Sequence, residues 1–230
     1  MAIHHPPDEL LLDYAAGNQD EAVALVVATH LALCPACRTR VADYEALGGV
    51  LLEDLEPVAV GGDLFGMVLR DLDATPDAPA PGDHRHAVPD VEIVPAAPGA
   101  LPRPLRDHVG GNIEAVPWRS ILPGLEEFDM DLGRRPRGRS TPKARLLRLK
   151  AGRAFPRHTH RGTELLLVLA GSFQDETGHY VRGDLSMADG SVEHQPVADD
   201  DQDCVCLIVT EAPLRLTGRF MRFLNPVLRL

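Results

Sequence analysis

The sequence predicts an α+β protein of two domains, a small N-terminal helical bundle and a C-terminal antiparallel β-barrel. Residues 8–73 carry apolar side chains at the three- to four-residue spacing of amphipathic helices. Residues 74–110 contain eight prolines, a composition that is typical of an extended connector. From there onward, short alternating runs are broken by glycine and proline, as in β-sandwiches and barrels. We therefore place the domains at 1–75 and 111–230, joined by a proline-rich linker at 76–110.

Four helices are expected in the first domain. Pro7, followed by two acidic residues, marks the start of the first helix, which ends near Gly17. Asp20 opens a second helix that runs to about Leu33, and Pro35 stands in the first turn of a third. A fourth segment is too short to be stable alone, so it must dock on its own domain or on another protein. Its apolar side chains form one stripe: Leu64, Phe65, Val68, Leu69 and Leu72.

Short strands are expected in the second domain. The most regular apolar runs cover residues 144–150, 165–170, 178–181, 204–210 and 220–224. Cys204 and Cys206 are two residues apart and therefore lie on one face of their strand. These thiols are either secondary targets of oxidation or small buried strand residues, and the spacing favours the second interpretation.

The negative charge of the chain is concentrated in its first third. The net charge is −11, and residues 1–75 hold 13 Asp and Glu against 3 Arg. An acidic surface is repelled by the phosphates of nucleic acids and attracted to basic surfaces. Direct binding to nucleic acid is therefore not expected.

The sequence indicates a cytoplasmic protein. No apolar run approaches the roughly 18 residues of a membrane span. The N-terminus lacks a basic region followed by an apolar run, so neither secretion nor a membrane anchor is indicated. Four cysteines in 230 residues do not make a disulfide framework. The C-P-A-C segment in a reducing compartment is typical of metal binding or redox chemistry.

His30, Cys34 and Cys37 form the first candidate metal site. His30 and Cys34 are four residues apart on one face of the second helix, and Cys37 follows across a proline bend. Such ligands suit tetrahedral zinc, and a structural zinc site normally has a fourth ligand. His5 is the best candidate for it, with its neighbour His4 as the rival. The alternative is a redox-active C-x-x-C, although a thioredoxin-type motif would follow a strand rather than a helix.

The same residues carry a family resemblance. H-x3-C-x2-C at a helix–helix corner, with His5 ahead of it, is similar to the zinc-binding anti-sigma domain of bacterial regulators. The resemblance implies a small domain that wedges between the promoter-binding regions of an extracytoplasmic-function sigma factor and blocks RNA polymerase. The acidic excess agrees with this independently, because a DNA-binding surface is basic.

A second candidate metal site lies in the β-domain. Residues 152–171 match the first cupin motif, with His158 and His160 on one face of a strand and Glu164 after them. His194 stands where the second cupin motif has its histidine. Three histidines and a carboxylate suit zinc, and equally iron, manganese or nickel. The alternative is a cupin barrel, a double-stranded β-helix or jelly roll, whose histidines no longer bind metal.

Together the two halves resemble the ChrR group of zinc-binding anti-sigma factors, which join an anti-sigma domain to a cupin sensor. The resemblance implies no catalysis, inhibition by the N-terminal half, and a cupin half that is needed for release by singlet oxygen and related oxidants. The alternatives are a metal-dependent cupin enzyme, such as a small-molecule dioxygenase, with an accessory zinc domain, and a scaffold or metal-storage protein. The H-x3-C-x2-C bundle favours the anti-sigma factor, because an enzyme has no need of it.

Overall fold

The computed structural model describes residues 2–73, 100–132, 142–218 and 223. Contacts between Cα atoms divide the chain into two compact units. The larger unit contains Met1–Gly48 and Ala97–Leu230, and the smaller one contains Gly49–Ala96. None of the helices in the described segments is long and apolar enough to cross a membrane.

The helices begin and end close to where the sequence predicts. The larger unit holds α1 (Asp8–Ala15), α2 (Glu21–Leu33), the first part of α3 (Pro35–Glu53), α5 (Arg103–Val109) and the 3₁₀ turn η1 (Ile113–Ala115). The side chain of Asp20 accepts a hydrogen bond from the backbone N–H of Ala22 and so caps α2. Cys34 ends α2 in an extended conformation, because the residue before a proline avoids the helical region. Pro35 then starts α3, and this bend brings the two helix ends together.

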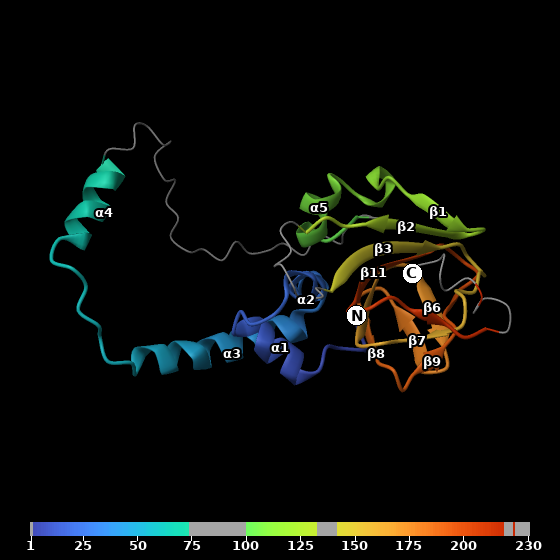
Figure 1. Cartoon of the computed structure of the whole chain (residues 1–230), viewed down its shortest axis with the longest axis horizontal. Coiled ribbons are helices and arrows are strands. Elements are labelled where there is room, and N and C mark those ends of the chain that lie inside the picture. The colour runs from blue at the N-terminus through green and yellow to red at the C-terminus, as the bar shows by residue number, and fades with distance from the viewer. Residues whose placement is uncertain (1, 74–99, 133–141, 219–222, 224–230) are drawn as a thin grey trace. The chain divides into compact units, whose positions relative to one another are not determined.

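The strands form one large and two small antiparallel sheets (Figure 1). The large sheet has the order β1-β2-β3-β11-β5-β8. Its strands are β1 (Arg119–Leu122), β2 (Leu125–Asp129), β3 (Lys143–Leu149), β5 (Glu164–Ala170), β8 (Leu185–Ala188) and β11 (Cys204–Thr210). The small sheets have the orders β10-β6-β7 and β12-β4-β9. Their strands are β4 (His158–Thr159), β6 (Ser172–Asp175), β7 (Gly178–Val181), β9 (Glu193–His194), β10 (Val197–Ala198) and β12 (Arg215–Leu216).

This architecture confirms the predicted α+β class, with a helical N-terminal region and a cupin-like β-domain. Four of the five expected strands are present as β3, β5, β7 and β11. The fifth, at 220–224, lies outside the described residues except for Phe223. β5 is buried on both faces: Leu165 and Leu167 belong to one core cluster, and Leu166 and Val168 to the other. This double burial explains why the strand is a continuous apolar run rather than an alternating one.

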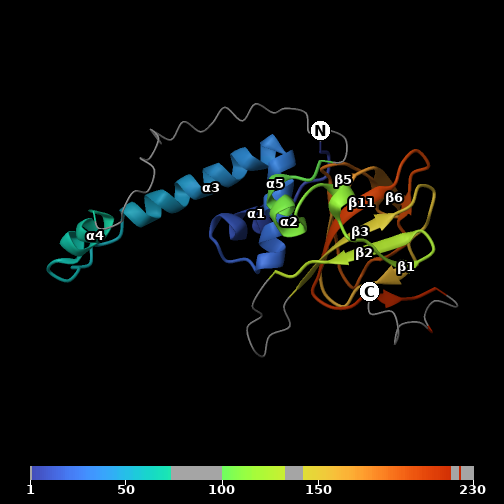
Figure 2. The ribbon, with the colours of Figure 1, turned by 90° about the horizontal axis from the view of Figure 1, so that it is seen from above.

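The N-terminal helices and the large sheet share one hydrophobic core, which differs from the expected separation into domains 1–75 and 111–230. Val26 and Val27 of α2 belong to the same buried cluster as Leu167 and Leu207 of the sheet. α2 contacts α5, β5 and β11 (Figure 2). The physical reason is that α2 is apolar on almost every side and therefore needs partners on more than one face.

The C-terminal end of the expected linker at 76–110 contains a short helix. Residues 76–99 lie outside the described residues, but α5 forms directly after Pro102 and ends at Gly110, whose φ of 71° is left-handed. Leu101 and Leu105 are buried, and α5 packs against α2. Prolines in the first turn of a helix cost no hydrogen bond, so a high proline content does not exclude this short helix.

The smaller unit exposes its apolar side chains. It contains the end of α3 and the predicted fourth helix, α4 (Leu64–Asp73). On α4, Phe65 is 77% exposed and Leu72 is 66% exposed. Other exposed apolar side chains of the smaller unit are Val50, Leu51, Leu52, Leu55, Val58 and Val60. We call the exposed apolar residues from Val50 to Leu72 the apolar stripe.

Candidate metal centres

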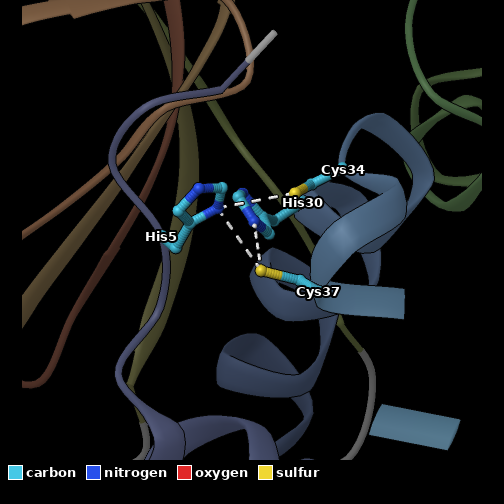
Figure 3. A group of neighbouring side chains, drawn as sticks. All are labelled: His5, His30, Cys34 and Cys37. Carbon is cyan, nitrogen blue, oxygen red and sulfur yellow. Dashed lines mark hydrogen bonds between the residues drawn. The ribbon is translucent and has the colours of Figure 1, made fainter. Parts of the chain in front are cut away.

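The first donor set lies where the N-terminal segment meets the α2–α3 corner. His30 stands in the last turn of α2, Cys34 follows that helix, and Cys37 is in the first turn of α3. His5 precedes α1 and reaches the same point (Figure 3). Its neighbour His4 points elsewhere and contacts Asp184. The structure therefore groups His5, and not His4, with the other three residues.

The spacing of these donor atoms fits a tetrahedral metal ion. His5 Nδ1 lies 3.4 Å from the Sγ atoms of both Cys34 and Cys37, and His30 Nε2 lies 3.3 Å from Cys37 Sγ. A zinc ion with Zn–S bonds of about 2.3 Å and Zn–N bonds of about 2.0 Å holds neighbouring donor atoms about 3.5 Å apart. Two thiols and two imidazoles are also a common ligand set of structural zinc.

Burial keeps His30 and Cys37 of the first site neutral when no metal is bound. His30 donates its Nδ1 proton to the backbone oxygen of Gly183 at 2.9 Å, so its Nε2 carries a lone pair toward Cys37. Burial lowers the pKa of His30 to about 4, which keeps the ring neutral. Without a metal, burial and the hydrogen bond with Cys34 raise the pKa of Cys37 to about 12. A metal ion that binds here must therefore displace a thiol proton.

The second donor set lies inside the β-domain. His158 belongs to β4, which pairs with β9 so that His158 is directly opposite His194. His160 follows β4, and Glu164 begins β5. All four side chains are buried, and their donor atoms lie within 4.8 Å of one another. The cupin-type spacing of the sequence thus brings together the four residues that it predicted.

The hydrogen bonds of the second site leave lone pairs that face each other. His158 donates from Nδ1 to the oxygen of Pro156 at 2.8 Å, and His194 donates from Nδ1 to Asp175 at 2.7 Å. Both Nε2 atoms are then unprotonated, yet they lie 3.0 Å apart. Two lone pairs at this distance repel each other unless a cation lies between them. Among the described residues, the buried Oε1 atom of Glu164 also has no hydrogen-bond partner.

Burial also sets the charges at the second site. It lowers the pKa of His158 to about 3 and that of His160 to about 4, so both rings are neutral ligands at neutral pH. Burial raises the pKa of Glu164 to about 7 when no metal is bound. Each of these shifts makes a donor group neutral when no metal is bound, and a divalent cation would favour the ionised carboxylate of Glu164.

Cys204 and Cys206 lie beside this second site. With His158 and Glu164 they line a mainly apolar cavity of about 40 Å³. Their Sγ atoms are 3.5 Å apart and both residues are buried. The hydrogen bond with Cys204, together with burial, raises the pKa of Cys206, so its thiol stays protonated and a weak nucleophile.

The sequence did not reveal the groups that support the ligands. Asp175, at the end of β6, orients His194, and the backbone of Gly183 orients His30. Gly183 lies 153 residues from the ligand that it supports. A backbone carbonyl leaves no signal in a sequence. Asp175 could have been identified only if the strand pairing were already known.

The fold and the two donor sets define a class of protein, a cupin-like barrel that shares its core with a His/Cys helical site. Residues 106–213 match the family model of the ChrR cupin-like domain. The anti-sigma-E factor ChrR of Cereibacter sphaeroides is 41% identical over 227 residues, which cover 99% of this chain and 98% of that protein.

A solved structure is similar over nearly the same length. It is the crystal structure of Rhodobacter sphaeroides SigE in complex with the anti-sigma ChrR, and the match has 39% identity and a TM-score of 0.73. The match covers 91% of this chain and 100% of the chain in that crystal structure. The chain described here belongs to the ChrR family of anti-sigma factors.

Proposed function

We propose that this protein is an anti-sigma factor that binds an extracytoplasmic-function sigma factor and keeps it from RNA polymerase. The observation that carries the proposal is the apolar stripe of the smaller unit, in which large apolar side chains are exposed one after another along a short segment rather than singly. The ChrR of the similar crystal structure is in complex with SigE, and a stripe of this kind is the surface that such a partner would cover.

The charge of the same region supports a sigma factor as the partner. The stripe lies within residues 1–75, where acidic residues outnumber basic ones by 13 to 3. The promoter-binding surfaces of a sigma factor must attract DNA phosphates and are therefore basic. An acidic surface with an apolar centre complements them, and the same charge opposes direct binding to nucleic acid.

We assign zinc to His5, His30, Cys34 and Cys37 as a structural site that holds the helix corner. His158, His160, Glu164 and His194 hold a second divalent ion, and zinc is the first choice for it among zinc, iron, manganese and nickel. The cupin-like barrel serves as the sensor that releases the sigma factor in response to oxidants such as singlet oxygen. We place the protein in the cytoplasm, where its partner works.

A catalytic role is disfavoured by the size of the barrel cavity. Sites for organic substrates have volumes of roughly 300–1,000 Å³, whereas the cavity beside His158 and Glu164 is about 40 Å³. This volume holds only a very small molecule. We therefore propose that the protein is not an enzyme.

In vitro transcription tests the proposed function. The full chain, loaded with zinc, is added to RNA polymerase and each extracytoplasmic-function sigma factor of the genome that encodes it. We expect transcription from the promoters of one such sigma factor to stop at an equimolar ratio. Transcription that continues with every sigma factor would contradict the proposal.

The metal of the barrel, rather than its thiols, is expected to sense the oxidant. His160→Ala removes one ligand, so the variant should still inhibit the sigma factor but should no longer release it on exposure to singlet oxygen. The double variant Cys204→Ser, Cys206→Ser should respond almost as the wild type does, because both thiols are buried and the raised pKa of Cys206 keeps its thiol protonated. Reporter transcription before and after exposure measures both. The reverse pattern would assign sensing to the thiols.

A further inference from the structure

Hydrogen bonds attach the N-terminal segment to the barrel immediately before His5, the first metal ligand in the sequence. The buried carboxylate of Asp184 accepts the backbone N–H of Ile3 at 2.6 Å and that of His4 at 3.1 Å. The His4 side chain lies 3.2 Å from the other oxygen of the same carboxylate. The backbone N–H of Leu185 donates to the oxygen of His4 at 3.1 Å. His5 follows this anchored residue directly, so Asp184 limits where its ring can lie.

The same turn of the barrel holds a second ligand of the site. His30 donates to the backbone oxygen of Gly183, the residue next to Asp184. Hydrogen bonds of this kind fix the tautomer and the orientation of a metal-binding histidine. The turn is itself held in shape, since Asp184 also accepts the backbone N–H of Val181 at 3.0 Å. Two of the four donors thus depend on the turn between β7 and β8.

The other end of the same hairpin supports the barrel site. β6 and β7 pair directly, and Asp175 at the tip of this hairpin accepts the Nδ1 proton of His194. Thr177 at the tip contacts Tyr180 of β7, and their two hydroxyl oxygens are 2.9 Å apart. The Tyr180 ring in turn lies 4.5 Å from the ring of His4. One hairpin, residues 172–181, therefore contacts a ligand of one site and the anchor of the other.

We propose that Asp184 is a positioning residue of the N-terminal metal site, and that the β6–β7 hairpin couples the two sites. This inference rests on the proposed function of both donor sets as metal centres. Loss of the barrel metal frees His194 and its partner Asp175, which lets the hairpin shift. The turn at Gly183 and Asp184 then holds His30 and the segment before His5 less tightly, so the N-terminal metal exchanges faster but stays bound.

Cobalt(II) exchange on the full chain separates the two sites. Only the N-terminal site has thiol ligands, so the thiolate-to-cobalt absorption reports that site alone. The experiment follows the decay of this absorption after excess EDTA is added. Asp184→Asn should accelerate the loss of cobalt by about tenfold to a hundredfold, the usual range for groups that support a ligand.

Asp199→Asn is the matched control. Asp199 accepts hydrogen bonds from Ser172 in β6 and His179 in β7, so it contacts the same hairpin but neither donor set. This variant should lose cobalt at the wild-type rate. If Asp184→Asn does not fold, as judged by circular dichroism, His4→Ala keeps the carboxylate and should give a smaller acceleration in the same direction.

A double-mutant comparison tests the coupling. His160→Ala empties the barrel site, and in the wild-type background it should speed the loss of cobalt from the N-terminal site. In the Asp184→Asn background, His160→Ala should add little to the rate of cobalt loss, because the β7–β8 turn no longer positions the N-terminal ligands. Additive effects would overturn the coupling, and a wild-type rate for folded Asp184→Asn or His4→Ala would overturn the positioning role. A wild-type chain without the thiolate-to-cobalt band would instead refute the metal site itself.

Discussion

Cys34→Ala is expected to abolish inhibition of the sigma factor. Cys34 is 1% exposed, and its Sγ lies 3.4 Å from His5 Nδ1 at the point where α2 ends. Structural zinc contributes about 10–16 kcal/mol to folding in zinc-finger peptides, so the loss of one ligand removes a large share of the energy that holds the corner. α3 should then separate from α2, and transcription should rise to the level seen without the protein.

Cys204→Ala is the control for this prediction. Cys204 is also a buried cysteine of the larger unit, but it belongs to β11 and to neither donor set. Its variant should keep the N-terminal metal and should inhibit as the wild type does. Metal content and transcription are measured on both purified proteins. Full inhibition by a Cys34→Ala protein that contains no N-terminal metal would refute the structural role of zinc.

The apolar stripe of α4 should supply much of the binding energy for the sigma factor. Val68 lies on the stripe face of the helix, and it is 50% exposed in the free chain. Val68→Asp would place a charge in the centre of an apolar interface. Because such central residues contribute 2 kcal/mol or more, we expect the dissociation constant to rise by about 30-fold or more.

Arg70 provides the control on the same helix. Its side chain is 66% exposed, and at 100° per residue it lies nearly opposite Leu64, Val68 and Leu72. Arg70→Asp should therefore change the dissociation constant by less than about threefold, as expected of a residue outside the interface centre. Isothermal titration calorimetry measures both variants. Equal losses for the two would show that α4 does not bind through this face.

The sequence was sufficient to group the residues of both donor sets, but for two different reasons. His30 and Cys34 share a face of one helix end, and the bend that brings in Cys37 depends on a proline that both ends one helix and starts the next. These features are encoded within a few residues and do not require the rest of the fold. His158 faces His194, 36 residues further on, because β4 pairs with β9, and only the cupin motif indicated this pairing.

The shared core could not be predicted in the same way. Periodicity indicates which side chains of α2 are apolar, but it does not indicate what covers them. The partners of Val26 and Val27 lie in β5 and β11, far along the chain. The support given by Gly183 and Asp184 escaped prediction for a related reason, since the contact depends on where the β7–β8 turn falls against α2 and the N-terminal segment.

The dependence of sigma-factor binding on the N-terminal metal tests the account most directly. A fluorescently labelled sigma factor is titrated with the full chain, first loaded with zinc and then after removal of the metal by a chelator, and anisotropy reports the complex. Zinc-loaded protein should form a one-to-one complex. The chelated protein should bind at least about 100-fold more weakly, which corresponds to a loss of about 2.8 kcal/mol, and added zinc should restore binding. Equal affinity of the zinc-loaded and chelated proteins, or no complex in either state, would contradict it.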